Sequence, residues 1–252
     1  MSTSRPTPEH LPSTLGRAAE RLGLSLSADQ FATFERYLDL IEAWNDRAGL
    51  TAIRDRDEVI RRLFGESLAL LVALRTTGLL TTGQVARVAD LGPGGGFPGL
   101  PMRIVDPALQ LILIEAQQRR CEFLEAVVAE LKLDGVEVVN ARAEDAGRDE
   151  ALRTSFDLVV ARAVAPLPVL VEYALPLLRP GGVLASPKGS RAAHELVEAQ
   201  NAIEVLGGIA LDPVALSLPD GVPAQQVLLV RRDGELDERF PRRAGMPSKR
   251  PL

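Results

Sequence analysis

An acidic residue followed by a glycine-rich loop is the part of this sequence that could bind a ligand. Asp90 ends an apolar run that starts at Val85. The loop after it contains five glycines, namely Gly92, Gly94, Gly95, Gly96 and Gly99. Glycine has no Cβ and tolerates positive φ, so this loop allows a ligand to contact the main chain. A helix that starts near Pro98 would direct its free N–H groups at the same ligand and favour an anionic group there.

Two nucleotide-like ligands fit such a loop, a nicotinamide dinucleotide and S-adenosylmethionine. The segment 94–99 satisfies the G-x-G-x-x-G pattern of dinucleotide sites, but that pattern is a weak signal in a chain with 21 glycines. Asp90 would also place a negative charge against the pyrophosphate of a dinucleotide. S-adenosylmethionine instead offers an ammonium group to the carboxylate and a carboxylate group to the loop amides. The sequence therefore favours S-adenosylmethionine, and a tight turn without a ligand is the alternative.

A second acid follows the next apolar run. Residues 109–114 are apolar except for Gln110, and such a run is typical of a strand buried on both faces of a parallel sheet. This run ends in Glu115. In nucleotide-binding α/β folds an acid at this place binds the ribose hydroxyls, and it would repel a phosphorylated 2′ position. The alternative for Glu115 is an ordinary solvated strand end.

The elements that must position these acids alternate between strand and helix from about residue 85, as in a parallel sheet covered on both faces. The apolar runs and turn signals predict seven strands, over 85–90, 109–115, 135–140, 156–162, 183–187, 209–217 and 225–232. They predict helices over 98–105, 117–132, 167–179 and 191–206, with Pro180-Gly181-Gly182 as the stop signal of the third. The last two strands, joined through Pro219-Asp220-Gly221, are expected to be antiparallel neighbours.

The predicted fold class is α/β, with a Rossmann-like, seven-stranded S-adenosylmethionine-dependent methyltransferase sheet and a helical N-terminal cap. The cap follows from apolar residues that recur at helical spacing, among them Phe31, Phe34, Leu38 and Ile41. We divide the chain into a cap over 1–82, a cofactor-binding methyltransferase domain over 83–238 and a basic tail over 239–252.

The composition excludes several other classes of protein. The 252 residues are 46% hydrophobic and 25% charged, which is typical of a soluble globular chain. Its single cysteine, Cys121, rules out an internal disulfide framework. The run 68–74 is too short to cross a bilayer, and residues 1–12 lack the apolar core of a secretion signal. We expect a cytoplasmic monomer without a metal, since neither a Cys/His cluster nor a Ser-His-Asp set can be assembled.

The positive charges are distributed unevenly. The net charge is −5, yet the tail carries five cations and no acid. Arginine binds phosphate in a bidentate fork and stacks on bases, so the basic tail favours a nucleic-acid partner. The candidate RNA-binding residues are Arg119, Arg120, Lys188, Arg242, Arg243, Lys249 and Arg250. The alternatives are a merely solvated surface, and a tail that packs against its own acidic domain.

Motifs along nearly the whole chain resemble one known family. They are Tyr37-Leu38, Trp44-Asn45 and Leu50-Thr51-Ala52-Ile53; the glycine loop 90–99; Glu115, Arg119-Arg120 and Phe123-Leu124; Arg142-Ala143-Glu144; Phe156-Asp157 and Arg162-Ala163-Val164-Ala165; Lys188-Gly189; and the ending Pro241-Arg242-Arg243, Pro247 and Pro251-Leu252. Together they resemble the bacterial small-subunit ribosomal RNA methyltransferase family once called glucose-inhibited division protein B. The resemblance implies methylation of guanine N7 in 16S rRNA, with S-adenosylmethionine as cofactor and free 16S rRNA or an assembling small subunit as partner.

The resemblance also implies roles for individual residues. The backbone from Gly92 through Gly94 and Gly96 to Phe97 would hold the methionine end of the cofactor, with Asp90 on its ammonium and Glu115 on its ribose. Ala143 and Glu144 would meet the adenine. Arg162 would belong to the same site, and Arg162 and Lys188 are the candidates for a part in methyl transfer. An ion pair with a nearby acid is the alternative for Arg162, and an exposed strand end for Lys188.

Three positions in the cap depart from the family pattern. Gly49 stands where an Asn is usual before Leu-Thr, and Leu63 and Glu66 replace a His and an Asp. These changes concern contacts with RNA and leave the cofactor loop intact. A methyltransferase that acts on a small molecule or protein, and a non-catalytic cofactor-binding module, are the two alternative functions.

Overall fold

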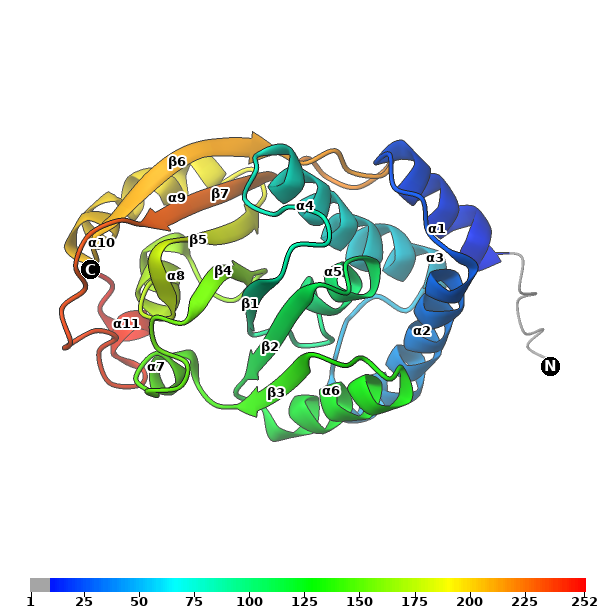
Figure 1. The fold of residues 1–252 in the computed structure, drawn as a ribbon, viewed down its shortest axis with the longest axis horizontal. Coiled ribbons are helices and arrows are strands. Elements are labelled where there is room, and N and C mark those ends of the chain that lie inside the picture. The colour runs from blue at the N-terminus through cyan, green and yellow to red at the C-terminus, as the bar shows by residue number, and fades with distance from the viewer. Residues whose placement is uncertain (1–9) are drawn as a thin grey trace.

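Runs of valine, isoleucine and leucine build a seven-stranded sheet in the computed structural model, which describes residues 10–252 (Figure 1). The strands are β1 (Ala86–Leu91), β2 (Leu109–Glu115), β3 (Val136–Asn140), β4 (Phe156–Ala161), β5 (Leu178–Lys188), β6 (Gly208–Ala215) and β7 (Gln226–Arg232). Their order across the sheet is β3-β2-β1-β4-β5-β7-β6. The strands β1 to β5 are parallel, and β7 is antiparallel to both of its neighbours. The predicted fold class, with its final antiparallel pair, is confirmed.

The strand order reverses between β1 and β4. The chain lays down β1, β2 and β3 in one direction and then returns to place β4 on the other side of β1. Loops after β1 and β4 therefore diverge to opposite faces of the sheet and leave a crevice at its carboxyl edge. Open α/β sheets bind their ligands at this switch point. The predicted cofactor loop, which follows β1, lies there.

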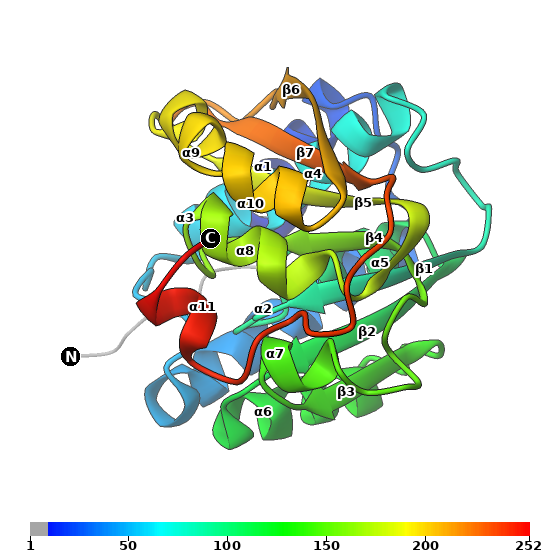
Figure 2. The ribbon, with the colours of Figure 1, turned by 90° about the vertical axis from the view of Figure 1, so that its left-hand side faces the viewer.

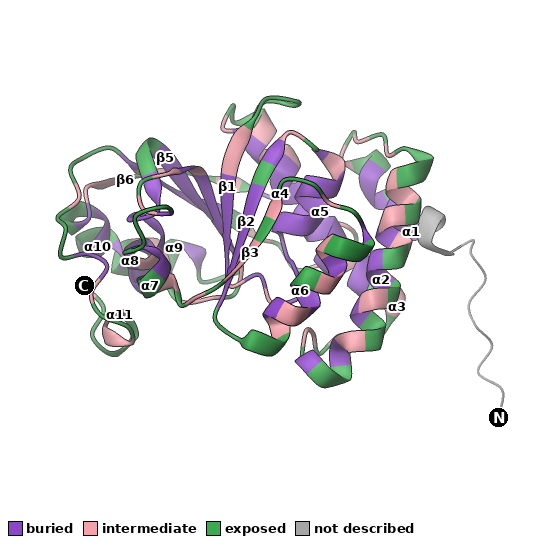
Figure 3. Ribbon diagram, turned by 60° about the horizontal axis from the view of Figure 1, so that its bottom comes forward, coloured by how far each residue is buried: buried purple, intermediate pink, exposed green. Residues whose placement is uncertain are grey.

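One face of the sheet is covered by the N-terminal helices together with α5 and α6 (Figure 1). These are α1 (His10–Arg21), α2 (Ala28–Ala48), α3 (Arg56–Val59), the π-helical turn η1 (Ile60–Phe64), α4 (Gly65–Thr76), α5 (Gly99–Val105) and α6 (Gln118–Glu130). Phe34 of α2 and Leu71 of α4 belong to the same buried cluster as Leu111 of β2. Figure 3 shows the buried sides of these helices turned towards the sheet. The predicted boundary at residue 82 is thus a change of secondary structure within one continuous core. Residues 1–9 of the predicted cap lie outside the described residues.

The other face carries α7 (Ala143–Ala146), α8 (Leu167–Ala174), α9 (Ala192–Glu198) and α10 (Gln200–Val205). Their core includes Phe156, Leu170 and Val230. The chain after β7 returns across this face, and its last helical turn is α11 (Met246–Lys249). Figure 2 shows this red segment running from the end of β7 past α8 and α7. The tail is therefore part of the folded domain.

Two predicted helices differ from the structure. The helix predicted over 167–179 ends at Ala174, because Pro176 has no N–H to donate to the carbonyl oxygen four residues back. The predicted stop signal lies inside β5 instead. A Cβ at Gly182 would lie 2.8 Å from the Phe156 carbonyl oxygen, so this glycine permits a close approach of two backbones. The helix predicted over 191–206 is divided at Ala199 into α9 and α10, and nothing in the sequence marks that break.

Cys121 packs under the end of β2. Its thiol is buried, donates to the Glu115 carbonyl oxygen at 3.3 Å and accepts from Asn140 Nδ2 at 3.2 Å. Burial raises the pKa of this thiol, so it is protonated and helps to fix the strand end. Between residues 10 and 252, no group of three or more His, Cys, Asp and Glu side chains could hold a metal ion. In the same range, no helix has the length and apolar character needed to cross a membrane.

Candidate functional site

Asp90 connects the two ends of the glycine loop. Its carboxyl group is completely buried at the end of β1, and Oδ2 accepts a hydrogen bond of 2.7 Å from the N–H of Gly99, where α5 begins. The other oxygen, Oδ1, has no hydrogen-bond partner among the described residues. Burial raises the pKa of Asp90 to about 8, although the Gly99 N–H and nearby Arg162 act in the opposite direction. The group is therefore largely protonated at neutral pH.

Glycine is required at different positions of the loop for different structural reasons. Gly92, Gly94 and Gly96 all have positive φ, between +57° and +92°. A side chain at Gly96 would collide with Tyr37 and Leu100, so packing alone requires this glycine. A Cβ at Gly94 would meet only the end of Arg120, at 3.9 Å. The main chain at Gly94 is thus the open part of the loop, where a ligand could approach closely.

Tyr37 of α2 supports the loop from below, which the sequence analysis missed. Its hydroxyl donates a short hydrogen bond to the carbonyl oxygen of Gly95. Its ring stacks on Phe97 at 5.7 Å and on Phe64 at 5.4 Å between centroids. Burial, followed by the effect of Asp90, raises the pKa of Tyr37 well above its usual value, so the hydroxyl keeps its proton. The available signal was a phenol on the buried stripe of a helix, because such a hydroxyl needs a partner.

Phe97 contributes to this arrangement through its ring. The ring is buried and also packs against Phe64, at 5.8 Å. Only the backbone of Phe97 can therefore serve a ligand, and the backbone is the part that the resemblance assigns to the cofactor.

Glu115 lies beside the loop at the end of β2. Its Oε2 accepts from the Gly94 N–H at 3.1 Å, and Oε1 accepts from the Gln117 N–H at 2.9 Å. The carboxylate is buried, so it is not an ordinary solvated strand end. It braces the open part of the loop and stands at the place where a ribose is expected.

Ala143 and Glu144 begin α7, the next position along the same edge. Glu144 is buried, and its Oε1 accepts a hydrogen bond of 2.7 Å from the Gly245 N–H in the tail. The side chain of Glu144 is thus directed at the tail. The backbone of this pair is the part that can meet an adenine.

Arg162 follows β4 and connects the loop to the N-terminal helices. Its Nη1 donates to Glu66 Oε2 at 3.0 Å and to the Arg62 carbonyl oxygen at 3.2 Å. Its guanidinium also lies 5.3 Å from the centroid of the Phe97 ring. The ion pair that was the alternative prediction for Arg162 is therefore present. Its acid, Glu66, is one of the residues that depart from the family pattern.

A cleft of about 850 Å³ opens next to Arg162, at the carboxyl ends of β4 and β5. Lys188 reaches it from β5, with Nζ 2.8 Å from both the Ala165 carbonyl oxygen and Glu195 Oε2. Apolar side chains, including Leu63 and Ile53, form part of the wall. The structure therefore brings both candidate catalytic residues together in one cleft, each held by a carboxylate.

The predicted RNA-binding residues fall into two groups. Arg119, Arg243, Lys249 and Arg250 are exposed. Arg120 is half-buried and donates to the Gly49 carbonyl oxygen at 3.0 Å. Arg242 is different, because its guanidinium binds the buried Glu172 at 2.6 Å. This ion pair is of the kind expected if the tail packs against its own domain, and the assignment of Arg242 to RNA stays a prediction.

Comparison with known proteins assigns this chain to a family. The profile of the family described as rRNA small subunit methyltransferase G (GidB) matches residues 30–220. A Ribosomal RNA small subunit methyltransferase G from Desulfitobacterium hafniense (strain Y51) is 42% identical over 246 residues, which cover 97% of this chain and 99% of the relative. This chain belongs to the rRNA small subunit methyltransferase G family. A relative of the same name from Chloroflexus aggregans is 44% identical over 232 residues, covering 91% and 93% of the two chains.

Solved structures agree on the fold. A protein described as a sarcosine dimethylglycine methyltransferase, from Galdieria sulphuraria, superposes with a TM-score of 0.52 at 12% identity, covering 71% of this chain and 88% of that one. The [4+2]-cyclase SpnF superposes with a TM-score of 0.53 at 17% identity, covering 82% and 97%. A methyltransferase and a cyclase share this fold, so the likeness alone leaves the chemistry open. The assignment to the rRNA small subunit methyltransferase G family rests on sequence and confirms the resemblance stated above.

Replacing Tyr37 with Phe should loosen the cofactor loop. The change removes the hydroxyl that donates to the Gly95 carbonyl oxygen and leaves this buried acceptor without that hydrogen bond. We expect a loss of about 1–3 kcal/mol in the free energy of unfolding, measured by urea denaturation. Tyr173→Phe in α8 is the matched control. An equal change in both variants would mean that the Tyr37 hydroxyl has no special part in holding the loop.

The charge of Asp90 should make stability depend on pH. The unfolded chain releases this proton near the ordinary pKa of 3.8, whereas the folded protein holds it until about pH 8. The stability that the protonated group contributes is therefore complete below about pH 4 and lost as the pH rises to about 8, at up to about 1.4 kcal/mol per pH unit. Asp90→Asn keeps an acceptor for the Gly99 N–H without the titration. Urea unfolding of both proteins across this range should show a gap that widens with pH, and a constant gap would contradict the raised pKa.

Proposed function

We propose that this protein transfers a methyl group from S-adenosylmethionine to N7 of a guanine in 16S rRNA. The observation that carries the proposal is membership of the rRNA small subunit methyltransferase G family, with relatives of that name matching nearly the full chain. The acid-and-glycine loop at the switch point of the sheet supports the same cofactor. We place the activity in the cytoplasm, on free 16S rRNA or an assembling small subunit.

The residues of the loop fit S-adenosylmethionine. Among the described residues, Asp90 Oδ1 is a buried oxygen without a partner. The ammonium group of the cofactor suits this place, because a cation there would favour the charged form of the acid. The open main chain at Gly94 suits its carboxylate, and Glu115 suits its ribose. The backbone of Ala143 and Glu144 then lies at the adenine end, beyond the ribose. When bound, the sulfonium supplies an activated methyl group.

The chain's own contribution to methyl transfer is orientation. Guanine N7 carries an in-plane lone pair and no proton, so no general base is required, and alignment of the reactants is the main task. Arg162 stands between the loop and the cleft, in contact distance of both. We assign it to the reacting edge of the site, and Lys188 to the target base or an adjacent phosphate. Glu66 and Glu195 hold these two cations in place.

The apolar and charged parts of the cleft suit a base on a phosphate backbone. Leu63 and Ile53 can cover the faces of a base, while Arg62 and Lys188 face its polar surroundings. The exposed cations Arg119, Arg243, Lys249 and Arg250, with the half-buried Arg120, extend the positive surface for RNA. Phosphate contacts of this kind position a nucleic acid without reading its sequence.

The function is tested by mapping the transferred methyl group. Small subunits or 16S rRNA from cells that lack this protein are incubated with it and labelled S-adenosylmethionine, and the label is located by cleavage at 7-methylguanine. We expect one labelled guanine. Label in a protein or small molecule, with none in RNA, would overturn the proposal.

Glu115→Gln should weaken cofactor binding by about 1–3 kcal/mol, the range for a hydrogen bond to a charged group.

The exposed tail cations should serve RNA alone. Changing Arg243, Lys249 and Arg250 to Gln should weaken RNA binding and reduce the slope of log K against log salt by about 0.7–0.9 for each lost phosphate contact. Cofactor affinity, measured by calorimetry, should stay unchanged. Arg179→Gln is the control, because Arg179 is an exposed cation near the opposite end of β5. An unaltered salt slope in the triple variant would show that these cations are only solvated.

A further inference from the structure

The tail contains an ion pair with a buried acid at a position where the sequence indicated a free cation. Arg242 places Nε and Nη2 against both carboxylate oxygens of Glu172, at distances between 2.6 and 3.1 Å. Its backbone N–H donates to the same carboxylate at 2.8 Å. Glu172 is completely buried in α8, and its hydrogen bonds raise the pKa of Arg242. A buried carboxylate with a forked arginine fixes both position and orientation.

Neighbouring contacts hold the same segment in register. Arg153 Nη1 donates to the Phe240 carbonyl oxygen at 2.7 Å, and Arg148 Nε donates to the Pro241 carbonyl oxygen at 2.9 Å. Phe240 itself is buried in the core of this face. Arg242 Nη2 also donates to the Arg250 carbonyl oxygen at 2.8 Å, which folds the end of the chain back over the ion pair. The segment is thus anchored before and after Arg242.

The anchored tail reaches the cofactor side of the sheet through Glu144. Gly245, three residues after Arg242, has φ +79° and donates its N–H to Glu144 Oε1 at 2.7 Å. Glu144 lies in α7, which follows β3, and β3 pairs with β2 up to Glu115 and Asn140. The tail therefore fixes the short helix that stands beside the proposed ribose acid.

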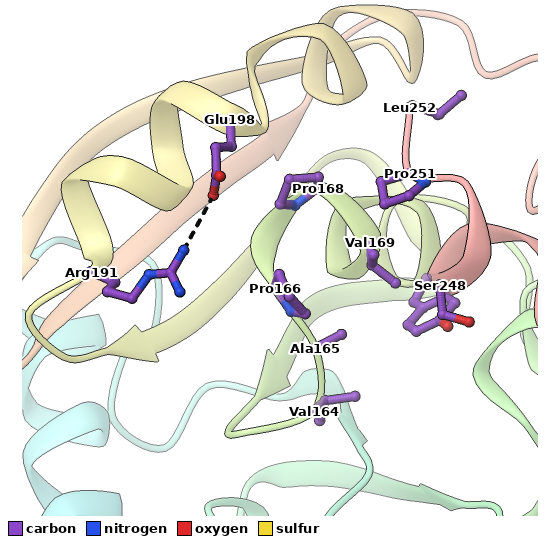
Figure 4. A pocket seen from close by; sticks show the side chains of 11 residues that line it. Val164, Ala165, Pro166, Pro168, Val169, Arg191, Glu198, Ser248, Pro251 and Leu252 are labelled. Atoms are coloured by element: carbon purple, nitrogen blue, oxygen red, sulfur yellow. Dashed lines mark ion pairs between the residues drawn. The ribbon is translucent and has the colours of Figure 1, made fainter.

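The end of the tail also closes a cavity next to the loop after β4. Figure 4 shows Ser248, Pro251 and Leu252 on one side of this cavity and Val164 and Ala165 on the other. Its volume is about 590 Å³. The side chain of Val164 lies 3.0 Å from where a Cβ on Gly92 would stand, so the wall opposite the tail is in contact with the cofactor loop.

We propose that Arg242 is a positioning residue of the cofactor site. The Arg242–Glu172 pair holds the tail on α8, the tail holds Glu144, and Glu144 fixes the backbone of α7 where the adenine end of the cofactor binds. This inference rests on the proposed function, since it concerns the same cofactor. It separates Arg242 from the exposed cations of the tail, which serve RNA.

The test compares Arg242→Gln with Arg243→Gln, a control that removes an equal charge from the adjacent, exposed position. Dissociation constants for S-adenosylmethionine are measured by calorimetry without RNA, and amide hydrogen exchange is followed over residues 143–147. We expect Arg242→Gln to weaken cofactor binding roughly tenfold and to speed exchange in α7. Arg243→Gln should change neither. In turnover, Arg242→Gln should raise the KM for S-adenosylmethionine and leave kcat at saturating cofactor close to that of the wild type.

Two further variants keep the test decisive if an unpaired Glu172 prevents folding. Glu172→Gln removes the buried charge and leaves an arginine whose side chain is 24% exposed and can be solvated by water. This variant should therefore fold and show the same change in cofactor affinity. Arg242→Lys restores the charge without the fork, and should give an affinity between those of Arg242→Gln and the wild type.

The outcomes distinguish the inference from the proposed function. Unchanged cofactor affinity in folded Arg242→Gln and Glu172→Gln would overturn the positioning role and leave the pair as structural. Reduced RNA affinity with unchanged cofactor affinity would return Arg242 to the RNA surface. If the wild-type protein itself fails to bind S-adenosylmethionine, the proposed function fails before any variant is compared.

Discussion

The hydrogen bond from the Gly99 N–H to Asp90 is the constraint on which the rest of the site depends. It joins the end of β1 to the start of α5 across a loop of five glycines. Such a loop loses much conformational freedom on folding, so it needs support from outside itself. Tyr37 provides this support from α2, and Glu115 from β2. The N-terminal helices are thus required by the loop, which explains why they share one core with the sheet.

Carboxylates around the site are already engaged with protein partners. Glu115 holds the loop, Glu66 and Glu195 hold the two cations of the cleft, and Glu144 holds the tail. Each of these bonds fixes a backbone or side chain before a ligand arrives, which lowers the ordering cost of binding. Asp90 Oδ1 is the contrasting case, because it is buried without a partner in the described part of the chain. Burial keeps this acid protonated, and a cationic group beside it would favour the carboxylate form.

Local patterns predicted the strands well, since each buried strand is a short apolar run whose period and bounding turns are visible in the sequence. Glu115 and Asp90 could be found because each ends such a run. The interactions that define the site join residues far apart in the chain, such as Arg162 with Glu66 and Arg242 with Glu172. No periodic pattern in the sequence indicates which residues form those pairs. By sequence, Arg242 and Arg243 are equivalent cations, and only their positions relative to a buried acid distinguish them.

The π-helical turn η1 explains how the cap reaches the cleft. The helices α3 and α4 are continuous through η1, and the Gly65 N–H bonds to the Ile60 carbonyl oxygen, five residues back. A turn of this kind adds one residue to the helix and so rotates the faces that follow by about 100° relative to those before it. Leu63 and Glu66 stand in or directly after this turn and line the cleft with Arg162. Without the extra residue the same sequence would direct Glu66 away from Arg162. The turn therefore places Leu63 and Glu66 on the cleft that the proposed function assigns to the target base.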